Sequence, residues 1–125
     1  MDTDFRVLCN GTKLHFRVRG TSAKNPHLLL LHGGPGFSSH MFYPWGVALE
    51  SKLNLVYLDQ RGCGESEKLT PQTAKSFTVA TLLKDIEAVR AHLKLGKWFV
   101  LGHSWDWSTS RPFLKRCVAM CTWTA

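Results

Sequence analysis

The stretch Lys97-Trp98-Phe99-Val100-Leu101-Gly102-His103-Ser104-Trp105 places an apolar run directly before a Gly-x-Ser turn. An uninterrupted apolar run of this kind is typical of a strand that is buried on both faces of a sheet. A serine on the sharp turn after such a strand has an exposed hydroxyl, and the next residue offers a backbone N–H to an oxyanion. The sequence therefore predicts Ser104 as a nucleophile and Trp105 as an oxyanion donor.

Two earlier apolar runs also lead into loops of unusual composition. Residues 28–31 are followed by His32-Gly33-Gly34-Pro35-Gly36, and residues 53–58 by Asp59-Gln60-Arg61-Gly62-Cys63-Gly64-Glu65-Ser66. A glycine-rich loop can bring backbone N–H groups close to a substrate carbonyl, so we expect Gly34 to be the second oxyanion donor and His32 to brace the loop. The alternative is a loop that is rich in glycine only for tight turning. We interpret segment 59–66 as a turn whose charges shape a pocket floor, in preference to direct catalysis.

The remaining segments predict an alternation of strands and helices. Residues 5–9 and 13–19 flank Asn10-Gly11, the pair that favours a tight antiparallel hairpin turn. A short crossover helix is expected within residues 42–51, and an amphipathic helix from Val79 to Leu93, stopped by Gly96. This order predicts an α/β fold with an antiparallel opening hairpin, followed by parallel strands with flanking helices.

The length of 125 residues suits one domain, and the net charge of +7 is spread over single basic residues. We therefore expect no nucleic-acid partner. No run approaches the roughly 20 apolar residues of a membrane span, and Met1-Asp2-Thr3-Asp4 has the wrong charge for a signal peptide, so we expect no membrane partner and a cytoplasmic location. Cys117 and Cys121 lack the second pair of ligands that a structural zinc site needs, so no metal is expected.

The three motifs together resemble those of the prolyl iminopeptidase branch of the α/β-hydrolase fold. That family combines a His-Gly-Gly-Pro-Gly loop, an Asp-Gln-Arg-Gly-x-Gly-x-Ser turn and a Gly-x-Ser-Trp-Gly-Gly elbow in this order. The first two motifs are complete here and the third holds through Trp105, so the resemblance covers residues 5–105. It implies a cofactor-free serine hydrolase that removes an N-terminal residue, classically proline, through an acyl-serine intermediate, with a small peptide, amide or ester as substrate. It also implies Ser104 as nucleophile, with Gly34 and Trp105 as backbone oxyanion donors.

The sequence departs from this family at Asp106, where the family has glycine. The acid and base of such enzymes follow the serine in chain order, yet Asp106 is the only acid after Ser104 and no histidine follows it. We therefore divide the chain into a partial α/β-hydrolase domain, residues 1–105, and an atypical tail, residues 106–125, that replaces the helix after the elbow. The expected function is that of a truncated serine hydrolase, inactive as this chain. The alternatives are a non-catalytic isoform or remnant that acts at most as a binding protein, and an esterase or amidase of the same fold.

The truncation also predicts self-association. The strand before the elbow is expected to pair with the four-leucine strand on one side and to have an unpaired apolar edge on the other. Such an edge is a template for pairing with another chain. The β-prone segment 117–124, Cys-Val-Ala-Met-Cys-Thr-Trp-Thr, could instead cover that edge in the same chain, or pair with the edge of a neighbour.

Overall fold

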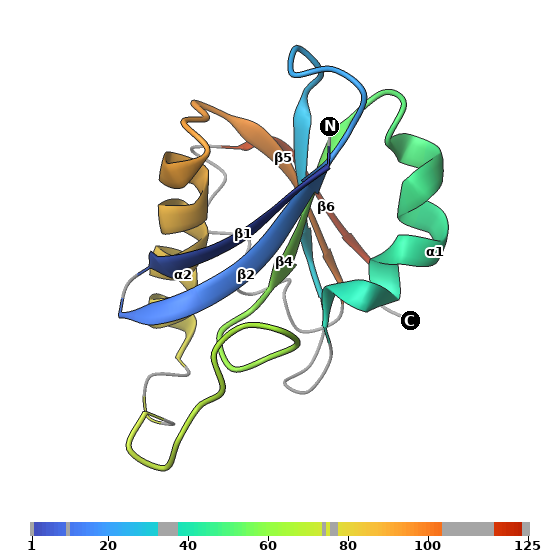
Figure 1. Ribbon diagram of the computed structural model, residues 1–125. Helices are drawn as coiled ribbons and strands as arrows, with labels where there is room; N and C mark the ends of the chain where they lie inside the picture. Colours follow the sequence, from blue (N-terminus) through green and yellow to red (C-terminus); the bar gives the residue numbers. More distant parts are fainter. Residues whose placement is uncertain are drawn as a thin grey trace.

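The computed structural model describes residues 2–9, 11–32, 38–73, 75, 78–103 and 117–123. Six strands form one mixed sheet in the order β1-β2-β4-β3-β5-β6 (Figure 1). The strands are β1 (Asp2–Cys9), β2 (Thr12–Arg19), β3 (His27–Leu31), β4 (Asn54–Asp59), β5 (Trp98–His103) and β6 (Cys117–Trp123). β2 is antiparallel to β1 and β4, and the other neighbouring pairs are parallel. The predicted α/β fold class, an opening hairpin followed by parallel strands, is confirmed.

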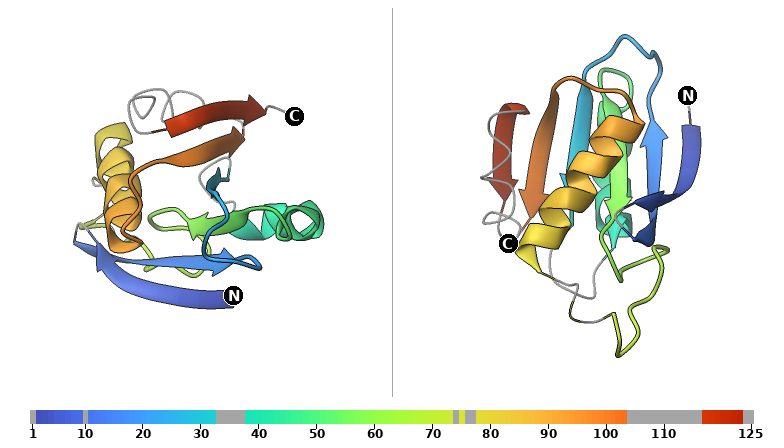
Figure 2. Two further views of the ribbon diagram at one scale, coloured as in Figure 1. Left: turned by 90° about the horizontal axis from the view of Figure 1, so that it is seen from above. Right: turned by 90° about the vertical axis from the view of Figure 1, so that its left-hand side faces the viewer.

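Helices cover both faces of the sheet (Figure 2). On one face lie three short helical turns, η1 (Ser39–Phe42), α1 (Tyr43–Gly46) and η2 (Val47–Leu49), in the region of the expected crossover helix, and on the other lies α2 (Val79–His92). Leu29 and Leu31 of β3 pack in the cluster that contains residues of α2, whereas Leu28 and Leu30 pack with Phe42. The leucine run is uninterrupted because each face of β3 is covered by a different layer.

The opening hairpin runs in register from Asp2 opposite Arg19 to Cys9 opposite Thr12. Gly11 supplies a backbone φ of +83° at the turn, in the left-handed region that glycine adopts at little cost. Alternate residues of β2 pack toward α2, so His15 belongs to the opposite face. It is nevertheless buried there, with 2% of its surface exposed.

The helix α2 begins at an N-cap, because the Thr78 hydroxyl accepts a hydrogen bond from the backbone N–H of Thr81. The end of α2 differs from the prediction that Gly96 stops the helix. The left-handed residue is Lys94, with φ of 58°, and not Gly96. The backbone N–H groups of Lys94 and Leu95 reach back to the carbonyls of Ala91 and Arg90, so the helix ends in a Schellman motif two residues before the glycine. No helix within the described ranges is long and apolar enough to cross a membrane.

The predicted parallel pairing of β5 with β3 is present, from Leu28 opposite Phe99 to Leu31 opposite Gly102. For the other edge of β5 the sequence left two outcomes open, an unpaired edge or an edge covered by segment 117–124, and the second is found. β6 pairs with β5 in parallel, up to His103 opposite Trp123, so residues of the tail cover the edge within the same chain. The physical reason is that backbone groups at an apolar edge take up whatever β-prone segment lies within reach.

Candidate active site at the carboxyl edge of the sheet

The three sequence motifs begin at one edge of the sheet. Leu31, at the end of β3, lies opposite Leu58 of β4 and opposite Gly102 of β5. Since all three strands are parallel, their carboxyl ends lie side by side at one edge of the sheet. Open α/β sheets bind their ligands at this edge, outside the carboxyl ends of the strands. The edge is therefore the candidate active site.

The residues predicted to do chemistry lie outside the described residues. The structure describes the chain up to His32 and again from Ser38, so Gly34 falls between these limits. It describes β5 up to His103, so Ser104 and Trp105 follow directly after its last described residue. Their roles as nucleophile and oxyanion donors therefore stay predictions.

His32 is fully buried and bonded twice to Gln60. Its ring Nε2 accepts a hydrogen bond of 3.0 Å from the backbone N–H of Gln60, and its carbonyl oxygen accepts one of 2.7 Å from the Gln60 side-chain amide. An accepting Nε2 leaves the proton of the neutral ring on Nδ1. These bonds fix the end of β3 to the end of β4, as expected of a residue that braces the loop between them.

Asp59, the residue before Gln60, anchors the far side of the same loop. Its fully buried carboxylate accepts hydrogen bonds from the backbone N–H groups of Ser39, at 2.8 Å, and Glu65, at 3.0 Å. Burial raises the pKa of this carboxyl, but these bonds and one with His15 outweigh burial, so the pKa lies below its usual value. The consecutive residues Asp59 and Gln60 thus hold both flanks, Ser39 and His32, of the segment that contains Gly34.

Gly64 and Ser66, from the same segment 59–66, pack against Asp59. Gly64 has φ of +51°, and a Cβ there would lie 2.4 Å from Asp59 Cγ. The Ser66 hydroxyl donates a hydrogen bond of 2.6 Å to the Asp59 carbonyl and accepts one of 2.8 Å from the backbone N–H of His15. The glycine and the serine of the motif therefore serve the folding of the turn. That the charges of this turn shape a pocket floor stays a prediction.

Arg61 ties this turn to α2 through an ion pair that sequence reasoning missed. Its Nε and Nη2 each donate a hydrogen bond of 2.9 Å to the carboxylate of Asp85, and both residues are buried. The hydrogen bonds to Asp85 raise the pKa of Arg61 above its ordinary value. One signal was present in the sequence, because Asp85 lies three residues after Leu82 and four before Val89, on the apolar side of the helix. A carboxylate at such a position needs a buried cation.

Comparisons with known proteins agree with this arrangement. A family model described as "alpha/beta hydrolase fold" matches residues 26–105. A proline iminopeptidase from Lactobacillus helveticus is 39% identical over 97 residues, which are 76% of this chain and 32% of that protein. The chain thus spans about a third of the length of this curated relative.

Solved structures show the same fold. A proline iminopeptidase-related protein from Thermus thermophilus superposes with a TM-score of 0.83 and 28% identity, over 93% of this chain and 41% of that one. An epoxide hydrolase from Vigna radiata superposes with a TM-score of 0.82 and 28% identity, over 97% of this chain and 39% of that one.

Proposed function

Because the chain belongs to the α/β-hydrolase fold family, we propose that it carries the nucleophile and oxyanion part of a serine hydrolase of proline iminopeptidase type. The observation that carries this proposal is the parallel register of β4, β3 and β5, which brings the ends of three motif-bearing strands to one edge. The proline iminopeptidase from Lactobacillus helveticus supports the choice of reaction. The substrate is then a small peptide with an N-terminal residue to be removed, classically proline.

In the proposed reaction the hydroxyl oxygen of Ser104 bonds to the carbonyl carbon of that N-terminal residue. The backbone N–H groups of Gly34 and Trp105 hold the oxyanion that develops. The peptide C–N bond then breaks, the rest of the peptide leaves with a proton on its amine, and water hydrolyses the acyl-serine. The described residues contribute position, since Gln60 and Asp59 hold the two flanks of the segment that contains Gly34.

A base must take the proton of the serine hydroxyl, and in this fold base and acid follow the nucleophile along the chain. The sequence offers no histidine after Ser104. We therefore propose that these 125 residues do not turn over substrate by themselves. Loss of a triad member leaves only about 10³ to 10⁴-fold acceleration over water, from binding and the oxyanion donors. A non-catalytic binding role is the alternative that the same observation favours.

A fluorophosphonate probe and a proline arylamide substrate test this proposal on the purified chain. We expect neither labelling of Ser104 nor turnover above that of the Ser104→Ala variant. Turnover at the rate of an ordinary hydrolase that disappears in Ser104→Ala would overturn the proposed inactivity.

A chimera tests the family role separately. Residues 106–125 are replaced by the helix and the remaining part of the Lactobacillus helveticus relative. Labelling of Ser104 and hydrolysis of the proline arylamide are then expected. A folded, soluble chimera that is not labelled would show that Ser104 is not the nucleophile, and one that cleaves only esters would favour an esterase of the same fold.

A further inference from the structure

The strand β1 lies at the outer edge of the sheet (Figure 2). Within the described part of the chain it ends the strand order and pairs with β2 alone. Successive backbone N–H and C=O groups of a strand point to alternate sides, so half of those of β1 face outward from the sheet. Most residues of β1 are exposed, and only Cys9 at its end is buried. An open edge of this kind accepts another extended strand.

The charged side chains of β1 share one face of the sheet. Phe5 and Val7 pack in the cluster that contains residues of α2. Because successive side chains of a strand point to opposite faces, Asp2, Asp4 and Arg6 lie on the other face. Along this face the strand therefore begins with two negative charges and continues with a positive one.

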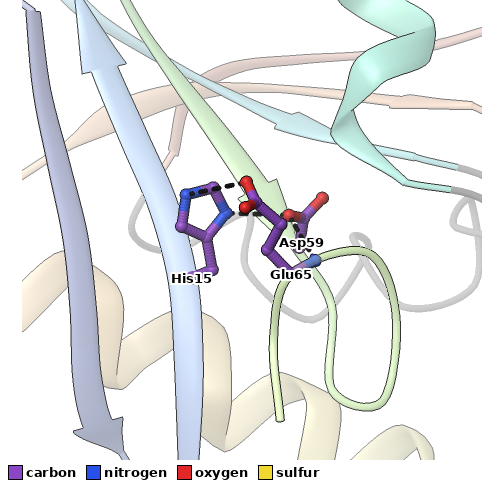
Figure 3. A group of neighbouring side chains, drawn as sticks. All are labelled: His15, Asp59 and Glu65. Atoms are coloured by element: carbon purple, nitrogen blue, oxygen red, sulfur yellow. Dashed lines mark hydrogen bonds and ion pairs between the residues drawn. The ribbon is translucent and has the colours of Figure 1, made fainter. Parts of the chain in front are cut away.

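Contacts within the chain hold Asp4 and Arg6 in place while leaving them exposed. Asp4 Oδ1 is hydrogen-bonded to His15 Nε2 at 2.6 Å, and His15 Nδ1 is bonded to the buried Asp59 at 2.8 Å (Figure 3). Arg6 donates from Nη2 to Glu65 Oε1 at 2.9 Å and from Nη1 to the Glu65 carbonyl oxygen at 3.2 Å. The side chains of Asp4 and Arg6 are nevertheless 54% and 55% exposed. Both charges therefore lose little conformational freedom when a partner binds.

We propose that the edge of β1 binds the same edge of a second copy of this chain, in antiparallel pairing about a two-fold axis. Residues directly opposite in such a pair share a face, so each two-fold register is centred on one residue. The register centred on Phe5 places Asp4 opposite the partner's Arg6, and Arg6 opposite the partner's Asp4. Opposite charges in these positions stabilise the pairing of strands, and like charges destabilise it. The dimer therefore contains this favourable pair twice.

The neighbouring two-fold registers are less favourable. A register centred on Asp4 or on Arg6 places that charge opposite itself. A register centred on Thr3 places Asp2 opposite the partner's Asp4. A register centred on Val7 pairs residues 5–9 alone and gives Arg6 no acidic residue opposite. The order of charges on β1 therefore selects one register.

The opposite face of β1 agrees with this register, because Phe5 then lies beside the partner's Phe5. Its ring stacks on Phe16, with centroids 4.9 Å apart, and meets His92 edge-on at 5.5 Å. It is only partly buried by these neighbours. Aromatic pairs across neighbouring strands are stabilising, so the contact at the axis joins the aromatic clusters of the two copies.

A charge-swap experiment by sedimentation equilibrium tests the pairing. Every chain carries Thr122→Lys, which places a charge on β6 at the other end of the described sheet order and so suppresses association there. With β1 unmodified, this chain is expected to form dimers with a micromolar dissociation constant. Asp4→Lys or Arg6→Glu alone places like charges opposite each other twice in every dimer. Each is expected to weaken dimerisation at least about tenfold.

An equimolar mixture of these two variants is the sharpest test. In the mixed dimer the new lysine lies opposite the new glutamate, and the unchanged Arg6 lies opposite the unchanged Asp4. The mixture is therefore expected to dimerise as strongly as the chain with unmodified β1, and so is the double variant with Asp4→Lys and Arg6→Glu. Asp2→Lys is the matched control, because it makes the same change of charge on the same face but lies opposite the partner's Leu8. It is expected to leave dimerisation unchanged.

Circular dichroism verifies that each variant is folded. The proposal is overturned if the chain with unmodified β1 is a monomer, in which case the charges of β1 serve to keep its edge free. It is also overturned if neither the mixture nor the double variant associates more strongly than the single variants, or if Asp2→Lys weakens the dimer as much as Asp4→Lys. None of these measurements involves Ser104, so the result is independent of the proposed hydrolase function.

Discussion

Replacing Gly64 by alanine is expected to destabilise the fold more than the same change at Gly11, Gly20 or Gly96. Its φ of +51° lies in the left-handed region, and the new Cβ would lie 2.4, 2.5 and 2.7 Å from Cγ, Oδ1 and Oδ2 of Asp59. Real Cβ atoms essentially never approach other atoms this closely. The carboxylate cannot retreat without losing hydrogen bonds from Ser39, Glu65 or His15.

The loss of unfolding free energy expected for Gly64→Ala has two parts. An L-residue with left-handed backbone costs about 1–2 kcal/mol. Loss of one hydrogen bond to the buried carboxylate of Asp59 costs about 1.5–3 kcal/mol more. We therefore expect Gly64→Ala to lower the free energy of unfolding by about 2.5–5 kcal/mol. The free energy of unfolding of an ordinary domain is about 5–15 kcal/mol, so this loss would be a large fraction of it.

Three further glycines separate the cost of the left-handed backbone from the cost of crowding. Gly11 has φ of +83° but nothing within 4 Å of a new Cβ, so Gly11→Ala measures the backbone cost alone. At Gly20 the φ is ordinary but a Cβ would lie 1.9 Å from Asn54 Oδ1, so Gly20→Ala measures crowding alone. Gly96 has neither feature, and Gly96→Ala is expected to be neutral or to stabilise by up to about 1 kcal/mol.

Urea unfolding followed by circular dichroism gives the four values, provided that each variant unfolds in one cooperative transition. The expected order of destabilisation places Gly64→Ala first and Gly96→Ala last. If Gly64→Ala costs no more than Gly11→Ala, the carboxylate of Asp59 moves freely. The buried acceptor would then not be the reason why this motif position requires glycine.

Three other outcomes follow from the contacts. Asp85→Leu is expected to cost about 3–5 kcal/mol in urea unfolding, because it leaves the buried guanidinium of Arg61 unpaired, whereas the double change with Arg61→Met is expected to cost much less; equal losses would contradict this. Because hydrogen bonds hold the pKa of Asp59 below its usual value, its contribution to stability is fully present above the unfolded-state pKa of about 3.9 and is lost as the pH falls through the lower folded-state pKa. Asp59→Asn is therefore expected to flatten the stability curve in acid, and an unchanged slope would argue against an ionised Asp59. Self-association is expected through β6, an uncharged strand that ends the sheet order of the described residues, and Thr122→Lys is expected to weaken it; sedimentation of the unmodified chain as a single monomer at micromolar concentration would contradict this.

Patterns of hydrophobic residues predicted the layers of the fold. The run Leu28 to Leu31 indicated a strand covered on both faces, and the helical spacing from Val79 to Leu93 indicated α2; both are confirmed. These predictions succeed because burial on a given face depends on nearest neighbours along the chain.

Features that depend on distant partners were missed. His15 looks like a solvent-facing polar residue in its own strand, and the position of Asp85 on the apolar side of α2 does not identify its partner. Both residues are buried because charged groups from other segments compensate them. The pairing of β6 with β5 was open in the sequence, because pairing at a sheet edge depends on which segment reaches it. The sequence predicted the three motifs of the candidate site. That these motifs begin at one edge depends on the order of β4, β3 and β5 in the sheet. The roles of Ser104, Trp105 and Gly34 stay predictions.

The strand order also governs when the candidate active edge can be assembled. β1 and β2 are joined by a tight turn, and hairpins of this kind form within microseconds. The pairing of β3 with β5 joins Leu28 to Phe99, and non-local parallel contacts of this kind slow folding. During synthesis on the ribosome, β3 is therefore complete long before β5 can pair with it. Until then the free edge of β3, one of the most apolar strands of the sheet, remains open to chaperones or to other nascent chains.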